Sequence, residues 1–128
     1  MPEMISHDIK VRVSPHYHGN YKGANFNLSA FSYLVVIENK SRHIFQLISR
    51  FWMIKDPLYP VKIIEGEGVI GETPILHPEA VFAYRSNAIS KSGMGAMKGH
   101  YILKNLASNE LIKVKIPCFQ LTAKYLRN

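Results

Sequence analysis

The segment EGEGVIGETP (residues 65–74) decides between an α/β fold and an all-β fold. Three glycines in it have the G-x-G-x-x-G spacing found in dinucleotide-binding proteins, namely Gly66, Gly68 and Gly71. That fingerprint requires a helix directly after the glycines, because the helix N-terminus holds the pyrophosphate. Here Pro74 and Pro78 follow, and proline interrupts the interior of a helix. The segment therefore predicts a connection in a β protein and not a dinucleotide site.

Outside this segment, most of the chain alternates apolar and polar residues with the period of two that is typical of a half-buried β-strand. At the N-terminal end, for example, Ile9, Val11 and Val13 alternate with charged or hydroxyl side chains. Connections containing Gly, Ser and Asn separate these runs, and no window has the pattern of an amphipathic helix. The predicted strands cover residues 9–14, 31–38, 43–55, 61–65, 80–89, 96–104 and 111–126.

The last of these runs changes phase at Pro117. Its apolar residues have even numbers from Ile112 to Ile116 and odd numbers from Phe119 to Tyr125. Because proline has no amide hydrogen to donate to a neighbouring strand, it belongs at a bulge or on an edge strand. We expect one strand with a bulge at Pro117, whose second half continues to face the core or passes to another sheet.

Seven or eight short strands without crossover helices predict an all-β fold, an antiparallel two-sheet β-sandwich. Trp52 falls in the middle of the third predicted strand, where a large ring can pack between two sheets. A closed barrel is the alternative architecture. The length of 128 residues is that of a single domain, which we expect to span residues 1–128.

The composition is that of an ordinary globular protein, with 47% apolar and 20% charged residues. Cys118 is the only cysteine, so an intramolecular disulfide is excluded and a cytoplasmic location is expected. No run of residues resembles a signal peptide or a membrane span, so we expect no membrane association. The net charge of +7 favours anionic partners.

The basic residues are scattered along the sequence. Two pairs are exceptions, Lys10 with Arg12 and Lys113 with Lys115, because their i, i+2 spacing places each pair on one face of a strand. We interpret these pairs as parts of a solvated outer face, with a surface that follows nucleic-acid phosphates as the alternative.

The run from His43 to Lys55 is apolar at both parities. A strand of a sandwich needs only one apolar face, so the other must be covered by loops, by a second subunit or by a partner protein. Arg50 lies within this run and needs a hydrogen-bonded partner if its head is withdrawn from water. The predicted interaction face comprises Phe45, Leu47, Phe51 and Met53. The opposite side comprises Ile44, Ile48, Trp52 and Ile54.

The glycine segment has a second interpretation besides shaping a sheet corner. Successive N–H groups around Gly66, Gly68 and Gly71 could form a concave anion site, with Lys62 supplying positive charge. Such a site would bind a phosphate, a pyrophosphate or a nucleotide. Three glutamates in the same segment would repel an anion and oppose this hypothesis.

Metal and catalytic chemistry have little support in the sequence. His16 and His18 have a spacing that projects two imidazoles to one face of a strand, but no third ligand is evident. The G-x-S-x-G motif is absent, and we interpret Cys118 as a buried or half-buried structural thiol. We therefore predict no cofactor and no enzymatic activity.

Four segments are matched in order and spacing by a known family: QLISRFW (46–52), EGEGVIGETPIL (65–76), GAMKGHY (95–101) and IPCFQL (116–121). On these segments the chain resembles the ApaG domain family, over nearly its whole length as far as Leu121. The chain departs from the family where Phe51 replaces a usual histidine and Ala80 follows Pro78-Glu79 in place of Pro-Gly-Glu. Any role of the family's histidine is therefore lost here.

The resemblance implies an all-β fold similar to fibronectin type III and immunoglobulin domains, and it implies no established enzyme activity. Related domains are attached to eukaryotic F-box proteins and to a polymerase-associated protein, and the bacterial family is associated with divalent-cation tolerance. We therefore expect a non-enzymatic protein-interaction module that binds a protein partner or forms a homo-oligomer. Binding of a nucleotide or pyrophosphate at residues 66–71 is the alternative.

Overall fold

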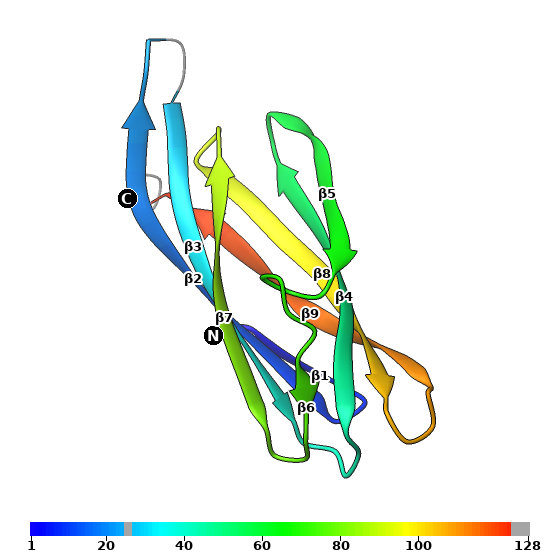
Figure 1. Ribbon diagram of the computed structural model, residues 1–128. Coiled ribbons are helices and arrows are strands. Elements are labelled where there is room, and N and C mark those ends of the chain that lie inside the picture. Colours follow the sequence, from blue (N-terminus) through cyan, green and yellow to red (C-terminus); the bar gives the residue numbers. More distant parts are fainter. Residues whose placement is uncertain (25–26, 124–128) are drawn as a thin grey trace.

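A computed structural model describes residues 1–24 and 27–123, which form nine β-strands and no helix (Figure 1). The described part of the chain thus offers no helix that could cross a membrane. One sheet contains β1 (Glu3–Ser6), β2 (Ile9–Lys22), β3 (Asn27–Asn39) and β7 (Val81–Ser90), in that order. The second sheet has the order β5 (Tyr59–Glu67), β4 (Phe45–Asp56), β8 (Met94–Asn105) and β9 (Leu111–Thr122), and β6 (Ile75–Leu76) pairs with the start of β4.

The two sheets pack face to face, and every strand pair within them is antiparallel. Figure 1 shows the two layers, with β5 and β4 on the side away from β2 and β3. Each sheet keeps two open edges, so the predicted β-sandwich is confirmed and the barrel alternative is wrong.

All seven predicted strands are present, several of them longer than the sequence indicated. The predictions missed β1 and β6, because four and two residues are too few to show a periodicity. Residues 124–126 of the last predicted strand lie outside the described residues.

The predicted bulge in the last strand is confirmed. The pairing of β8 with β9 shifts between the pairs Met97–Phe119 and Gly99–Ile116, so β9 has one extra residue there. Ile116 and Phe119 are both buried, although they differ in parity. β9 stays in its sheet as an edge strand, where the missing amide of Pro117 costs no ladder hydrogen bond.

A second bulge, in β4, corrects the predicted interaction face. The pairing of β4 with β8 shifts between Leu47 and Ser49, so Ile48 is the extra residue and the phase of the strand reverses. Phe45 and Leu47 are therefore buried in the core, whereas Phe51 and Met53 face outward. The prediction that these four side chains share one face is wrong, because a strict period of two does not allow for an inserted residue.

Trp52 is buried at the centre of the sandwich, as predicted, and packs against rings from both sheets. Its centroid lies 5.4 Å from that of Tyr33 in β3 and 6.0 Å from that of Phe119 in β9. The hydroxyls of Tyr84 in β7 and Tyr101 in β8 also join the two sheets through a buried hydrogen bond. Burial raises the pKa of both phenols, so they remain neutral.

Asn39 closes one end of the sandwich through a fully satisfied side chain. It is 0% exposed, and its amide donates to the carbonyl oxygens of His43 at 2.8 Å and Leu76 at 2.9 Å. Its Oδ1 accepts hydrogen bonds from the amide and the hydroxyl of Ser41, at 2.9 and 2.6 Å. Asn39 thus joins the end of β3 to β6 and to the residues that lead into β4.

Asp56 closes the opposite end of β4. Its Oδ1 accepts from the amide of Leu58 at 3.0 Å, and its Oδ2 accepts from the hydroxyl of Ser90 at 3.0 Å. Partial desolvation opposes ionisation of this carboxyl, but these bonds and those from Ser92 outweigh it and lower the pKa. The carboxylate therefore ties the β4–β5 turn to the connection between β7 and β8.

Replacing Asn39 by alanine should lower the free energy of unfolding by about 2–4 kcal/mol, because several buried hydrogen-bonding groups lose their partner. Urea denaturation followed by tryptophan fluorescence measures the change. The matched control is Asn105→Ala, since Asn105 caps an exposed turn through the amides of Ala107 and Ser108 and should cost less than about 1 kcal/mol. Equal losses for the two variants would contradict the structural role given to Asn39.

Candidate functional site

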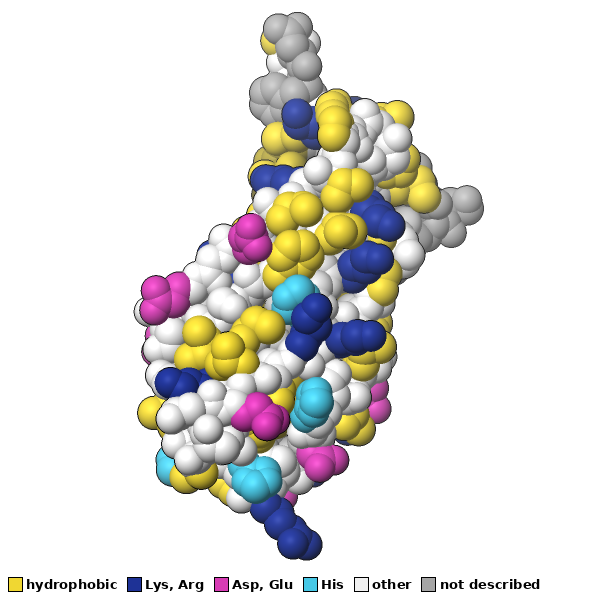
Figure 2. Space-filling view, turned by 90° about the vertical axis from the view of Figure 1, so that its right-hand side faces the viewer, with side chains coloured by type: hydrophobic (Ala, Val, Ile, Leu, Met, Phe, Trp, Pro, Cys, Tyr) yellow, Lys and Arg dark blue, Asp and Glu magenta, His cyan; other side chains and the backbone are white. Residues whose placement is uncertain are grey.

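The outward side of the β5–β4–β8–β9 sheet, called the outer face below, combines apolar and basic side chains. Cross-strand pairing places Phe51 of β4 opposite His100 of β8, and His100 opposite Lys115 of β9. The adjacent row places Met53 opposite Lys98. Figure 2, which views the molecule from the side of β5 and β4, shows hydrophobic side chains gathered beside a column of Lys and Arg side chains.

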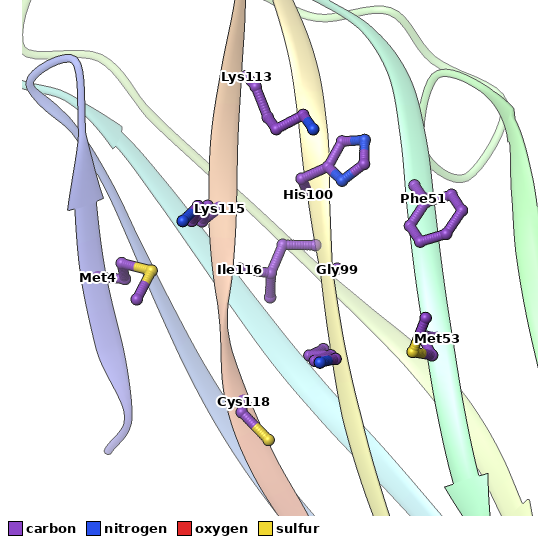
Figure 3. Close-up of a pocket in the computed structure, with 10 residues that line it drawn as sticks. Met4, Phe51, Met53, Gly99, His100, Lys113, Lys115, Ile116 and Cys118 are labelled. Atoms are coloured by element: carbon purple, nitrogen blue, oxygen red, sulfur yellow. The ribbon is translucent and has the colours of Figure 1, made fainter. Parts of the chain in front are cut away.

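A shallow groove of about 350 Å³ lies on the outer face (Figure 3). Its lining includes Phe51 and Met53 from β4, Met4 from β1, and three lysines from β8 and β9, namely Lys98, Lys113 and Lys115. Gly99 of β8 and Cys118 of β9 also line it. Cys118 is exposed, so the prediction that this cysteine is buried or half-buried is wrong. A neighbouring hollow of about 370 Å³ shares Phe51 and His100 with this groove and extends to Glu65 on β5.

The rings of Phe51 and His100 form the wall between the two hollows. Their centroids lie 4.9 Å apart, and the ring planes differ by only 11°. Partial desolvation lowers the pKa of His100, and the positive charge of Lys113 lowers it further, although Glu65 has a weaker opposite effect. Figure 3 shows the Lys113 side chain directed toward the imidazole. At neutral pH the stack therefore consists of two uncharged rings.

The main chain of the glycine segment accepts hydrogen bonds from Arg50. The guanidinium Nη1 donates to the carbonyl oxygens of Glu67 at 2.9 Å and Gly68 at 3.0 Å. A Cβ atom on Gly66 would lie 3.2 Å from the same nitrogen, so the absence of a side chain lets the guanidinium lie against the backbone. The expectation that Arg50 finds a hydrogen-bonded partner is confirmed, and that partner is the main chain of the segment.

A tight turn from Val69 to Glu72 follows these carbonyls. The amides and carbonyls of Val69 and Glu72 exchange two hydrogen bonds, of 2.8 and 2.9 Å. Ile70 and Gly71 occupy the left-handed region at φ 43° and 78°, which is typical of a type I′ turn. Val69 is buried and anchors the turn to the core.

Three amides of the glycine segment already have hydrogen-bond acceptors within the protein. The amide of Gly68 donates to the carbonyl of Ile48 at 2.7 Å, and those of Val69 and Glu72 are used within the turn. Lys62 is four residues before Gly66, which corresponds to about 13 Å along an extended strand. It lies opposite Ile54 and borders a different hollow, so the structure does not bring Lys62 and the glycines together.

His16 and His18 lie side by side on β2, with ring centroids 5.1 Å apart. A bulge between Tyr17 and Gly19 places His18 so that its Nε2 lies 2.6 Å from the Ser32 hydroxyl. Within residues 1–24 and 27–123, no group of three His, Cys, Asp or Glu side chains is arranged to hold a metal ion. The pair thus has a hydroxyl partner on the neighbouring strand and lacks a third ligand among these residues.

Apart from Phe51 and Met53, the residues that line the groove were not predicted as site residues; they include Met4, Lys98, His100 and Cys118. Met4 belongs to the missed strand β1. Lys98 and His100 lie within the predicted strand 96–104, but alternation within one strand does not reveal which strands are neighbours. Lys113 and Lys115 share an outward face, as their spacing predicted.

Gly68 and Gly71 should respond differently to replacement by alanine. Both have positive φ, but a Cβ on Gly68 would lie 2.2 Å from the carbonyl oxygen of Glu72, whereas none of the considered heavy atoms lies within 4 Å at Gly71. Gly71→Ala should therefore cost about 1 kcal/mol of unfolding free energy from backbone strain. Gly68→Ala should cost about 2–4 kcal/mol, because steric overlap adds to the strain. Urea denaturation of both variants tests whether Gly68→Ala is the more destabilising substitution. Equal urea midpoints for the two variants would contradict this expectation.

The imidazole of His100 should titrate with a midpoint below 6.5, measured by NMR of its Cε1 proton. Lys113→Gln should raise the midpoint, and Glu65→Gln should lower it. Because the pKa of His100 is lower in the folded chain than in the unfolded chain, the unfolded chain binds the proton first as the pH falls. The contribution of His100 to stability is therefore fully present above about pH 6.5 and is lost as the pH falls from there to the folded pKa. A midpoint above 6.5 would contradict the partial desolvation and the effect of Lys113 assigned to this ring.

Comparisons with known proteins identify the family. The ApaG domain model matches residues 21–105. The chain is 32% identical to Protein ApaG of Chromohalobacter salexigens over 121 residues, which cover 94% of both chains. It is 40% identical to Protein ApaG of Caulobacter vibrioides over 93% of this chain and 84% of that one. A crystal structure of a Bordetella pertussis protein named ApaA is 30% identical, covers 96% of both chains and superposes with a TM-score of 0.80. With this sandwich and these matches, the chain belongs to the ApaG domain family.

Proposed function

We propose that this ApaG-domain protein is a non-enzymatic protein-interaction module whose binding surface is the outer face. The observation that carries the proposal is the position of Phe51 and Met53, which the bulge at Ile48 turns away from the core. Both side chains are only half buried and line an open groove. The single cysteine requires no oxidising compartment, in keeping with action in the cytoplasm.

The composition of the outer face suits recognition of a protein. Aromatic and methionine side chains are enriched at the centres of protein interfaces, and charged groups surround them. Here Phe51, His100 and Met53 lie on the central strands β4 and β8, with Lys98 beside them on β8, while Lys113 and Lys115 lie on the edge strand β9. The outward side of a two-layer sandwich is ordinarily polar, so these half-buried rings and the Met53 thioether favour an intermolecular contact.

A binding role is favoured over catalysis by the chemistry of the groove. Its ionisable groups are three lysines, a histidine and the thiol of Cys118, and no carboxylate lines it. Among the described residues, no hydrogen bond joins this thiol to a general base. The groove is also open to solvent, whereas catalysis by a positioned acid or base benefits from exclusion of water.

Anion binding at residues 66–71 is the weaker candidate. The amides of Val69 and Glu72 are used within the turn, and Arg50 donates to the carbonyl oxygens of Glu67 and Gly68. The Arg50 guanidinium is thus occupied by these carbonyl oxygens. Glu65, Glu67 and Glu72 add negative charge.

Phe51→Glu should abolish recovery of a specific partner when the intact chain is immobilised and exposed to a cell extract, because a carboxylate replaces the central ring. The matched control is Val81→Glu, which introduces the same charge at an exposed apolar residue of the other sheet. Quantitative mass spectrometry should show at least a tenfold loss for Phe51→Glu and an unchanged recovery for Val81→Glu. Unchanged thermal unfolding of both variants excludes misfolding.

Two results would contradict this function. One is that the wild-type chain retains no protein above the level of an empty matrix and sediments as a monomer at all concentrations. The other is that Phe51→Glu and Val81→Glu reduce recovery equally. Self-association that Phe51→Glu removes would instead identify a second copy of the chain as the occupant of the outer face.

A further inference from the structure

We infer that the occupant of the outer face is an acidic segment of a partner protein that carries an apolar anchor residue. This inference rests on the proposed function and adds the chemistry of the partner. It assigns the apolar anchor to the groove beside Phe51 and Met53, and the acidic side chains to the three lysines at its β8 and β9 side.

The lysines of the groove form no ion pair among the described residues. Within residues 1–24 and 27–123, the ion pairs with N–O distances up to 4.0 Å involve Lys10 and Lys40 only. No such pair therefore joins a described carboxylate to Lys98, Lys113 or Lys115. No Asp or Glu side chain lines the groove. Three like charges on adjacent strands repel each other, so an acidic ligand gains electrostatic energy that a neutral ligand does not.

The apolar part of the groove lies directly beside these charges. His100 stacks on Phe51 and lies opposite Lys115 in the pairing of β8 with β9. One row across the sheet therefore contains a phenyl ring on β4, an imidazole on β8 and an ammonium group on β9. Lys98 faces Met53 in the next row. A ligand that spans adjacent strands, which lie about 4.8 Å apart, therefore meets an apolar and a cationic position within one or two residues of its own length.

The distribution of charge also fixes the orientation of the ligand. Glu65, directly opposite Phe51 on β5, borders the neighbouring hollow, whereas the groove toward β9 contains only cationic and neutral groups. Acidic side chains are repelled at the β5 side and attracted at the β9 side. The segment should therefore place its carboxylates over β9 and its anchor over β4.

A protein ligand fits these features better than a nucleic acid. Single-stranded nucleic acids bind where successive aromatic rings stack on bases along a continuous basic path. Here Phe51 and His100 stack on each other, so each ring has at most one face left for a base. Beyond the stack, Glu65 adds a negative charge, and the Arg50 guanidinium there already donates to main-chain carbonyl oxygens. Thioethers of Met4 and Met53 in the lining also favour an apolar side chain as ligand.

The test is selection of phage-displayed random linear peptides on the intact wild-type chain. Enriched peptides should contain several Asp or Glu residues next to one aromatic or large aliphatic residue. Their affinity should fall at least tenfold with Phe51→Glu and with Lys115→Glu. The control Arg85→Glu makes the same charge change as Lys115→Glu, at an exposed residue of the other sheet, and should leave the affinity unchanged. Raising the salt from low to physiological concentration should weaken binding about threefold or more.

The outcomes separate the two proposals. Peptides that depend on Phe51 but are neutral or basic would overturn the acidic partner and leave the interaction module standing. Absence of enriched peptides, or acidic peptides that bind Phe51→Glu as well as wild type, would contradict both. Tighter binding of a single-stranded oligothymidylate than of any selected peptide would assign the face to nucleic acid and also overturn the inference.

Discussion

One inserted residue, Ile48 in β4, determines which side chains of this protein are core and which are surface. The strand is apolar at both parities, so two arrangements would each bury a row of hydrophobic groups. Because the bulge reverses the phase, Leu47 and Trp52 both face the interior although they differ in parity. The same reversal turns Phe51 and Met53 outward beside the lysines of β8 and β9, so the core and the outer face share one cause.

The bulge is held by the segment that resembles a nucleotide motif. The carbonyl of Ile48 accepts the amide of Gly68, and Arg50, two residues later, donates to the carbonyls of Glu67 and Gly68. Gly66 gives room to the guanidinium, and the positive φ of Gly68 lets the chain turn into the Val69–Glu72 hairpin. The glycine spacing is thus explained by backbone geometry around an arginine, without a bound phosphate.

Much of the fold follows from local pattern, because alternation and turn residues act over a few positions. The helix-free sandwich, the bulge at Pro117 and the buried Trp52 are all recoverable in this way. The bulge at Ile48 is not, because Ile48 is a β-branched residue with no proline or glycine to mark it. The outer face was only half predicted for a related reason. Placing His100 between Phe51 and Lys115 depends on the order of strands in the sheet, which joins residues more than ten positions apart.

The phase of β4 is therefore the claim on which the rest depends, and nuclear Overhauser effects between ring protons test it without altering the protein. The account predicts cross-peaks from the Trp52 indole to the rings of Tyr33 and Phe119, and from the Phe51 ring to the imidazole of His100. Cross-peaks from Phe51 to Tyr33 or Phe119 would show that the strand continues without a bulge. The interior and the proposed binding surface would then both be wrongly assigned.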